Sequence, residues 1–153
     1  MNRSVSDTVS VPVLAAQLGY AGLIPFVLLS TGAWVFAEEF HAAINTALLS
    51  YAAIILSFMG AVHWGLAIAG RDGVQAWQLG LSVMPPLIAW FASLTNPMIN
   101  YSILIVAFVG LCLFDGRMVK DGKAPAWYPR LRTPLTAVVV ISLIVAQLAL
   151  VFK

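Results

Sequence analysis

The chain has 153 residues, of which 61% are hydrophobic and only 9% are charged, whereas soluble domains carry about 25% charged residues. This composition indicates an integral membrane protein and leaves no room for a soluble domain. The net charge is only +2, so the position of each charge along the chain matters more than their sum. The single cysteine, Cys112, excludes an intrachain disulfide, and we interpret it as a packing residue.

Five apolar segments are predicted to cross the membrane, because about 20 apolar residues in a helix span a bilayer. They cover residues 12–37, 42–69, 75–94, 97–114 and 133–152. Spans of this length, with short loops between them, use nearly the whole chain. We therefore predict one all-α domain, a polytopic bundle of about five transmembrane helices.

The first span contains Pro25 near its middle, which predicts a kink. Gln17 and Tyr20 are three residues apart and share a helix face, so they are expected to point into the bundle or, alternatively, to lie at the interface. The acidic turn that follows, Glu38 and Glu39 with His41, is interpreted as solvated rather than metal-binding. A catalytic zinc site needs three protein ligands and an open position.

The second span is predicted to organise the bundle, because small side chains recur along it at every fourth position. A helix places such residues on one ridge, where neighbouring helices can approach closely. His63 lies off this ridge, roughly 80–100° around the helix. The predicted packing ridge consists of Ala53, Ser57, Ala61, Gly65 and Ala69.

The remaining spans carry fewer polar residues. In the third, Gln78 begins a polar stripe that ends at the Pro85–Pro86 pair. Asp115 is expected to end the fourth span. Thr133 is expected to cap the fifth, which is rich in valine, isoleucine and leucine and is predicted to be a peripheral, lipid-facing helix.

Basic residues are distributed unequally between the two sides of the predicted bundle. Seven of the eight lie in the amino terminus, in loop 70–74 or in the loop before the fifth span, and only Lys153 lies on the other side. The positive-inside rule therefore predicts a cytoplasmic amino terminus and an external carboxyl terminus. Within the long loop we interpret four residues as interface or lipid contacts, with anionic lipid a more natural partner than nucleic acid: Trp127, Tyr128, Arg130 and Arg132.

With this orientation, polar residues converge in the cytoplasmic leaflet, where ionisable groups are costly and suggest function by default. The candidate polar cluster consists of His63, Asp115, Gln17, Tyr20 and Gln78. His63 and Asp115 form the natural pair. Either His63 only holds the helices in register, or it binds a ligand or carries protons.

No arrangement of residues supports a specific chemistry. Paired intramembrane carboxylates, a nucleophile beside a base and a phosphate-binding glycine loop are all missing from the sequence. His41 and His63 are roughly 33 Å apart along one helix, too far to hold one haem within a single chain. We therefore predict no enzyme, catalytic residue, metal or cofactor. A non-enzymatic accessory or scaffold protein for lipid, other membrane proteins or itself ranks first, a small-molecule or proton-linked transporter second, and a quinone- or haem-handling redox protein third.

Four segments resemble a family of uncharacterised membrane proteins that includes mitochondrial transmembrane protein 69 and bacterial inner-membrane relatives. They are LGYAGLIPF at 18–26, SFMGAVHWGLA at 57–67, MPPLIAW at 84–90 and APAWYPRLRTPLT at 124–136. The resemblance implies a compact helical membrane protein and supplies no catalytic residue. Because the chain lacks an arginine-rich transit segment, we expect a bacterial inner-membrane protein.

Overall fold

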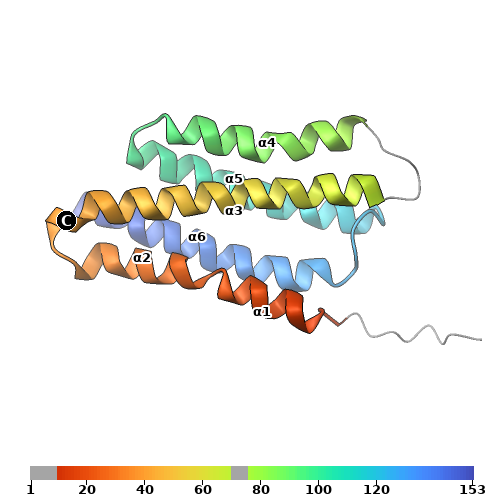
Figure 1. Ribbon diagram of the computed structural model, residues 1–153, viewed down its shortest axis with the longest axis horizontal. Helices are drawn as coiled ribbons and strands as arrows, with labels where there is room; N and C mark the ends of the chain where they lie inside the picture. The colour runs from red at the N-terminus through yellow and green to blue at the C-terminus, as the bar shows by residue number, and fades with distance from the viewer. Residues whose placement is uncertain (1–9, 70–75) are drawn as a thin grey trace, which may run out of the picture.

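The computed structural model describes residues 10–69 and 76–153, and this part of the chain is entirely helical. Figure 1 shows long helices lying side by side, with successive long helices running in opposite directions. In chain order the elements are α1 (Val13–Ala21), α2 (Ile24–Val35), a short 3₁₀ turn (Glu38–Phe40), α3 (His41–Ala69), α4 (Ala76–Ser93), α5 (Pro97–Lys120) and α6 (Tyr128–Phe152). The predicted all-α polytopic bundle is confirmed.

Four segments of the described chain are long and apolar enough to cross a membrane: Val13–Val35, Glu38–Ala69, Pro97–Lys120 and Tyr128–Phe152. The third predicted span is not among them, although it forms a helix, α4. Figure 1 shows α4 returning alongside α3, so its two ends lie at opposite ends of the bundle.

The predicted kink in the first span is a complete break between α1 and α2. Because proline has no backbone N–H, Pro25 cannot continue the hydrogen-bond ladder of α1. Pro25 instead takes a position in the first turn of α2. The break exposes the carbonyl of Gly22, which accepts a 3.0 Å hydrogen bond from the Tyr51 hydroxyl on α3. The kink is thereby tied to the central helix.

Helices α3 and α4 pack tightly at Gly60, one position away from the predicted ridge. A Cβ atom on Gly60 would lie 2.6 Å from the Ser82 carbonyl oxygen. The Ser82 carbonyl has no intrahelical donor, because the residue four positions later is Pro86, which has no N–H. The rings of Pro85 and Pro86 also lie close to Gly60, so only glycine leaves room for the proline pair at this contact.

The residues of the predicted ridge do not face the interior of the bundle as expected. A Cβ on Gly65 would meet nothing within 4 Å, and Ala61 and Ala69 are also exposed. Ala53 and Ser57 are half-buried. The spacing of four was read correctly, but the series that begins at Ala52 and passes through Leu56 to Gly60 is the one that faces the bundle.

The predicted ends of the last two spans were wrong. Helix α5 continues through Asp115 to Lys120, and α6 begins at Tyr128, so Pro134 lies inside the helix. Both helices therefore extend into residues 115–132, which were predicted to be a loop. The extra turns place Asp115 and Arg132 within helices rather than at their ends.

Helix α6 is also not peripheral, which corrects a second prediction. It packs against α5 and α2 and more lightly against α1. Ala146 is fully buried, and the Trp34 indole N–H on α2 donates a 2.9 Å hydrogen bond to the Val145 carbonyl. An apolar composition suits a buried helix as well as a lipid-facing one, so composition alone could not distinguish the two.

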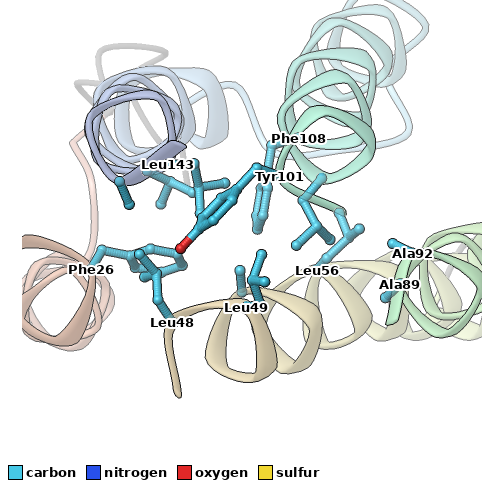
Figure 2. Packing of buried hydrophobic residues seen from close by; sticks show 13 residues of the cluster. Phe26, Leu48, Leu49, Leu56, Ala89, Ala92, Tyr101, Phe108 and Leu143 are labelled. Atoms are coloured by element: carbon cyan, nitrogen blue, oxygen red, sulfur yellow. The ribbon is translucent and has the colours of Figure 1, made fainter. Parts of the chain in front are cut away.

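The centre of the bundle is a continuous apolar cluster drawn from α2, α3, α4, α5 and α6. Figure 2 shows Tyr101 inside it, with the hydroxyl directed toward Phe26 and Leu48. This hydroxyl donates a 2.7 Å hydrogen bond to Asn45 Oδ1 on α3, so its burial does not leave it unpaired. The other members are Leu49, Ala52, Leu56, Ala89, Ala92, Leu104, Phe108, Val139, Leu143 and Ala146.

Candidate functional site

A buried ion pair joins α5 to α6 at one end of the bundle. Asp115 points inward from α5 five residues before that helix ends, and Arg132 points inward from the second turn of α6. The Arg132 Nε atom donates a 2.7 Å hydrogen bond to Asp115 Oδ2. Their side chains are only 6% and 2% exposed. A charge-assisted bond of this length in a dry interior is strong.

His63 adds α3 to the same group. Its Nε2 lies 2.7 Å from Asp115 Oδ1, so both carboxylate oxygens are approached by a nitrogen. The two contacts with the carboxylate differ in geometry. Arg132 Nε forms a well-aligned hydrogen bond with Asp115 Oδ2, whereas His63 Nε2 and Asp115 Oδ1 are close but not well aligned. We therefore describe the histidine contact as a close electrostatic approach. The other side of the imidazole meets the Phe114 ring edge-on, at 5.3 Å between centroids.

Thr136 lies one helical turn beyond Arg132 and is buried beside it on α6. We refer to His63, Asp115, Arg132 and Thr136 as the three-helix cluster. Apart from the His63 Nε2–Asp115 Oδ1 contact, three buried polar atoms of the cluster lack a hydrogen-bond partner: His63 Nδ1, Arg132 Nη2 and Thr136 Oγ1. Most native buried polar groups are paired, so this concentration of unpaired atoms in one place is unusual.

The α5–α6 loop, residues 121–127, contacts the start of α4. Lys123 Nζ lies 4.3 Å above the ring of Trp77, which stands at the start of α4. Trp127 and Tyr128 pack against each other with ring centroids 6.0 Å apart. The Lys123 contact therefore ties the loop to the start of α4.

The structure brings together only part of the candidate polar cluster. His63 and Asp115 meet, but Gln17 and Tyr20 are exposed on α1 and Gln78 is half-buried on α4. Among the predicted lipid contacts, Arg130 is exposed and Trp127 and Tyr128 are half-buried, whereas Arg132 is buried in the ion pair. Interpreting Arg132 as a lipid contact was therefore wrong.

Sequence reasoning missed the place of Arg132 in the polar cluster and did not name Thr136, although a signal for both existed. Arg132, Thr136, Val139 and Leu143 recur at helical spacing and are all buried in α6. Extending the helical pattern back through Pro134 would have placed Arg132 on the inner face. The described residues also contain no group of three or more histidine, cysteine or acidic side chains arranged to hold a metal ion.

Taken together, the fold and its buried cluster define a polytopic helical membrane protein with a charged interhelical contact. The sequence profile of DUF3429, described as a protein of unknown function, matches residues 11–148. The chain therefore belongs to the DUF3429 family, as the four sequence segments indicated.

The chain is also similar to transmembrane protein 69 of Xenopus tropicalis, at 35% identity over 141 residues. The match covers 87% of this chain and 53% of the relative, so the chain spans about half the length of that protein. No solved structure matches the chain.

Proposed function

We propose that this protein is a non-enzymatic accessory protein of the membrane, which works by binding lipid or other membrane components. The observation that carries the proposal is the state of Asp115, which is approached on one oxygen by Arg132 and on the other by His63. Its charge is thus used to join α3, α5 and α6. A carboxylate held in this way serves the architecture of the bundle.

Arg132 also weakens the case for a proton-linked transporter, the second candidate. A carboxylate that carries protons must release its partner during the cycle, and the guanidinium group remains charged at any physiological pH. Breaking the buried pair would leave Arg132 as an isolated buried cation, which is strongly unfavourable. The ion pair therefore favours a structural use of the Asp115 carboxylate.

We further propose that the chain lies in a bacterial inner membrane with the three-helix cluster in the cytoplasmic leaflet. Arg117, Lys120, Lys123 and Arg130 lie around the end of the bundle that holds the cluster, whereas Glu38, Glu39 and Lys153 lie at the other end. Figure 1 shows the α5–α6 loop and the start of α1 at one end and the carboxyl terminus at the opposite end. Arg3 and Arg71 lie outside the described residues. The positive-inside rule supports this orientation.

Two measurements on the purified protein test the proposal. In liposomes that enclose a pH-sensitive dye, an imposed pH gradient should decay at the same rate with the wild type, with His63→Gln and with no protein. Glutamine keeps a donor and an acceptor but cannot titrate. A proton flux present in the wild type and lost in His63→Gln would favour the transporter.

The second measurement addresses binding directly. Native mass spectrometry after gentle detergent extraction should detect lipid or a partner chain bound to the protein in a defined ratio. Recovery of the bare chain alone, under conditions where a control membrane protein keeps its lipid, would contradict the proposal.

A further inference from the structure

An apolar groove lies between α4 and α5 on the surface of the bundle. It consists of two adjoining hollows, each with a volume of about 340 Å³, which share Ile88, Val106 and Ala107. Val106 and Met84 line it and are exposed, and α5 is long and apolar enough to cross a membrane. The groove therefore opens toward lipid. We call it the α4–α5 groove.

The groove has about the length of one membrane leaflet. Along α5 it extends from Ser102 to Phe114, which is roughly 18 Å by helix rise. Half of the hydrocarbon core of a bilayer is about 15 Å. Phe114 lies toward the end of α5 that leads into the α5–α6 loop, so the groove extends from that membrane surface toward the opposite leaflet. These dimensions suit an acyl chain whose head group lies at the surface.

The groove itself offers a ligand almost no polar contact. Of the described residues that line it, only Ser102 has a polar side chain. Its hydroxyl already donates a 3.1 Å hydrogen bond to the Met98 carbonyl and accepts one from Gln147. A ligand with a polar group deep in the groove would therefore leave that group unpaired, which is unfavourable. Selection among amphiphiles must take place at the surface end.

Arg117 continues the α5 side of the groove toward the membrane surface. It follows Phe114 by three residues and Gly110 by seven, and both of these line the groove, so the three share one helix face. Arg117 is exposed. Because a helical side chain leans toward the amino-terminal end of its helix, Arg117 leans back toward Phe114. A cation therefore stands at the surface end of the groove.

A second cation stands at the same end on the α4 side. Trp77 lies four residues before Leu81, which lines the groove, so the two share a face of α4. Lys123 Nζ lies 4.3 Å from the centre of the Trp77 ring. Figure 1 shows the start of α4 and the end of α5 at the same end of the bundle. We call Arg117, Lys123 and Trp77 the groove mouth.

The charge around the groove mouth selects the head group. Residues 116–130 contain four basic residues and one acidic residue, Asp121. Asp115, just before them, is paired with Arg132 and adds no free negative charge. The mouth therefore lies in a positively charged region, and basic side chains at a membrane surface attract anionic lipid head groups. Trp77 at this depth is also typical of a membrane interface.

We propose that the α4–α5 groove binds an anionic phospholipid, with one acyl chain between α4 and α5 and the head-group phosphate at Arg117 and Lys123. The guanidinium group can donate two hydrogen bonds to a phosphate. A zwitterionic phospholipid offers the same acyl chains, but its own cation opposes the basic residues. This inference rests on the proposed function, the binding of a membrane component, and assigns it a lipid class and a site.

Matched variants test the two parts of the site separately. Arg117→Gln removes one positive charge at the groove mouth, and Lys153→Gln removes one at the opposite end of the bundle. A double variant adds Lys123→Gln. Gly110 lines the groove and a Cβ there meets nothing within 4 Å, so Gly110→Leu fills the groove without a clash. Gly65 has equally open space but is not part of the groove, so Gly65→Leu is its control.

The experiment is native mass spectrometry of the delipidated full chain in a mild detergent. Phosphatidylglycerol or phosphatidylcholine with the same acyl chains is added in steps, and the apparent Kd of the first bound lipid is measured. We expect phosphatidylglycerol to bind the wild type at least about tenfold more tightly, because each basic side chain near an anionic lipid contributes a factor of about five. Arg117→Gln should reduce this preference about fivefold, and Lys153→Gln should keep it.

The remaining variants complete the expected pattern. The double variant should bind the two lipids with affinities within about twofold of each other, since both cations of the mouth are gone. Gly110→Leu should weaken the binding of both lipids at least about fivefold, because its side chain occupies the volume of the acyl chain. Gly65→Leu should bind both lipids like the wild type.

Three results would overturn the proposed site: equal affinity of the wild type for the two lipids, a preference that survives in the double variant, or equal binding by the two glycine variants. In each case lipid still binds, so the accessory function stands. If neither lipid binds but gently extracted protein carries a partner chain, again only the site fails. If neither lipid binds and the extracted protein carries no lipid or partner, the site and the proposed function both fail.

Discussion

Asp115 and Arg132 are 17 residues apart in the chain, yet they form a 2.7 Å hydrogen bond inside the bundle. The intervening segment contains the α5–α6 loop, so the pair closes a helical hairpin at its base. His63 approaches the same carboxylate from α3. Asp115 is the one buried carboxylate among the described residues, and it lies where α3, α5 and α6 meet.

Replacement of Gly60 by alanine should destabilise the contact between α3 and α4. The new Cβ would lie 2.6 Å from the Ser82 carbonyl oxygen, which belongs to the backbone and cannot rotate away. Overpacking of this kind costs about 1–3 kcal/mol. The measurement is the free energy of unfolding by SDS in mixed micelles.

Gly65→Ala on the same helix is the control, because its Cβ would meet nothing within 4 Å. It should be neutral, or stabilising by up to about 1 kcal/mol through helix propensity. Equal loss of stability in both variants would show that the close helix contact is not at Gly60.

Ala146→Leu should destabilise the protein by about 1–3 kcal/mol, because extra methylene groups do not fit a filled core. Ala146 is fully buried where α6 packs in the bundle. Ala137→Leu, at an exposed position of the same helix, should have little effect. Thermal unfolding in detergent compares the two. A tolerated Ala146→Leu would mean that α6 is peripheral after all.

Tyr101→Phe should cost about 0.5–2 kcal/mol, the range found for interhelical hydrogen bonds in membrane proteins. The change removes the hydroxyl that bonds Asn45 Oδ1 at 2.7 Å and leaves that acceptor unpaired in the core. Tyr20→Phe, at an exposed position on α1, serves as the reference. If the two variants unfold alike, the buried hydrogen bond contributes nothing measurable.

Topology can be checked with reporters fused to the chain. A reporter active only outside the cytoplasm should work when fused after Lys153, and a reporter fluorescent only inside should work when inserted at Gly122 in the α5–α6 loop. This expectation follows from the basic residues Arg117, Lys120 and Lys123 near that loop. A cytoplasmic carboxyl terminus would reverse the orientation or remove one crossing.

The sequence alone was sufficient for the helical architecture, because apolar length is a strong signal in membrane proteins. It predicted a kink near Pro25, where the structure has a complete break, and the physical reason is the same, namely the missing N–H. It failed at helix ends near charged residues. Asp115 interrupts the apolar run in sequence, but a counterion on another helix permits its burial, and a single-sequence pattern carries no information about that partner.

The same limit explains the candidate site. Proximity of His63 and Asp115 could be proposed from depth, since both lie a few residues from the same membrane surface. Depth says nothing about which helices are neighbours, so Gln17 and Tyr20 were included although α1 contacts mainly α6. Arg132 was assigned to the interface contacts instead of the polar cluster, because a basic residue near a predicted loop is typical of an interface anchor.

A double-mutant cycle on Asp115 and Arg132 tests the role of the cluster most directly. Asp115→Asn and Arg132→Gln, made singly, each leave a buried charge without its partner and should cost about 3–5 kcal/mol in free energy of unfolding. The double variant leaves no unpaired charge, so it should lose at least about 1 kcal/mol less than the sum of the single losses. Single losses that add to within about 0.5 kcal/mol would contradict the account, because uncoupled residues cannot be joining α5 to α6.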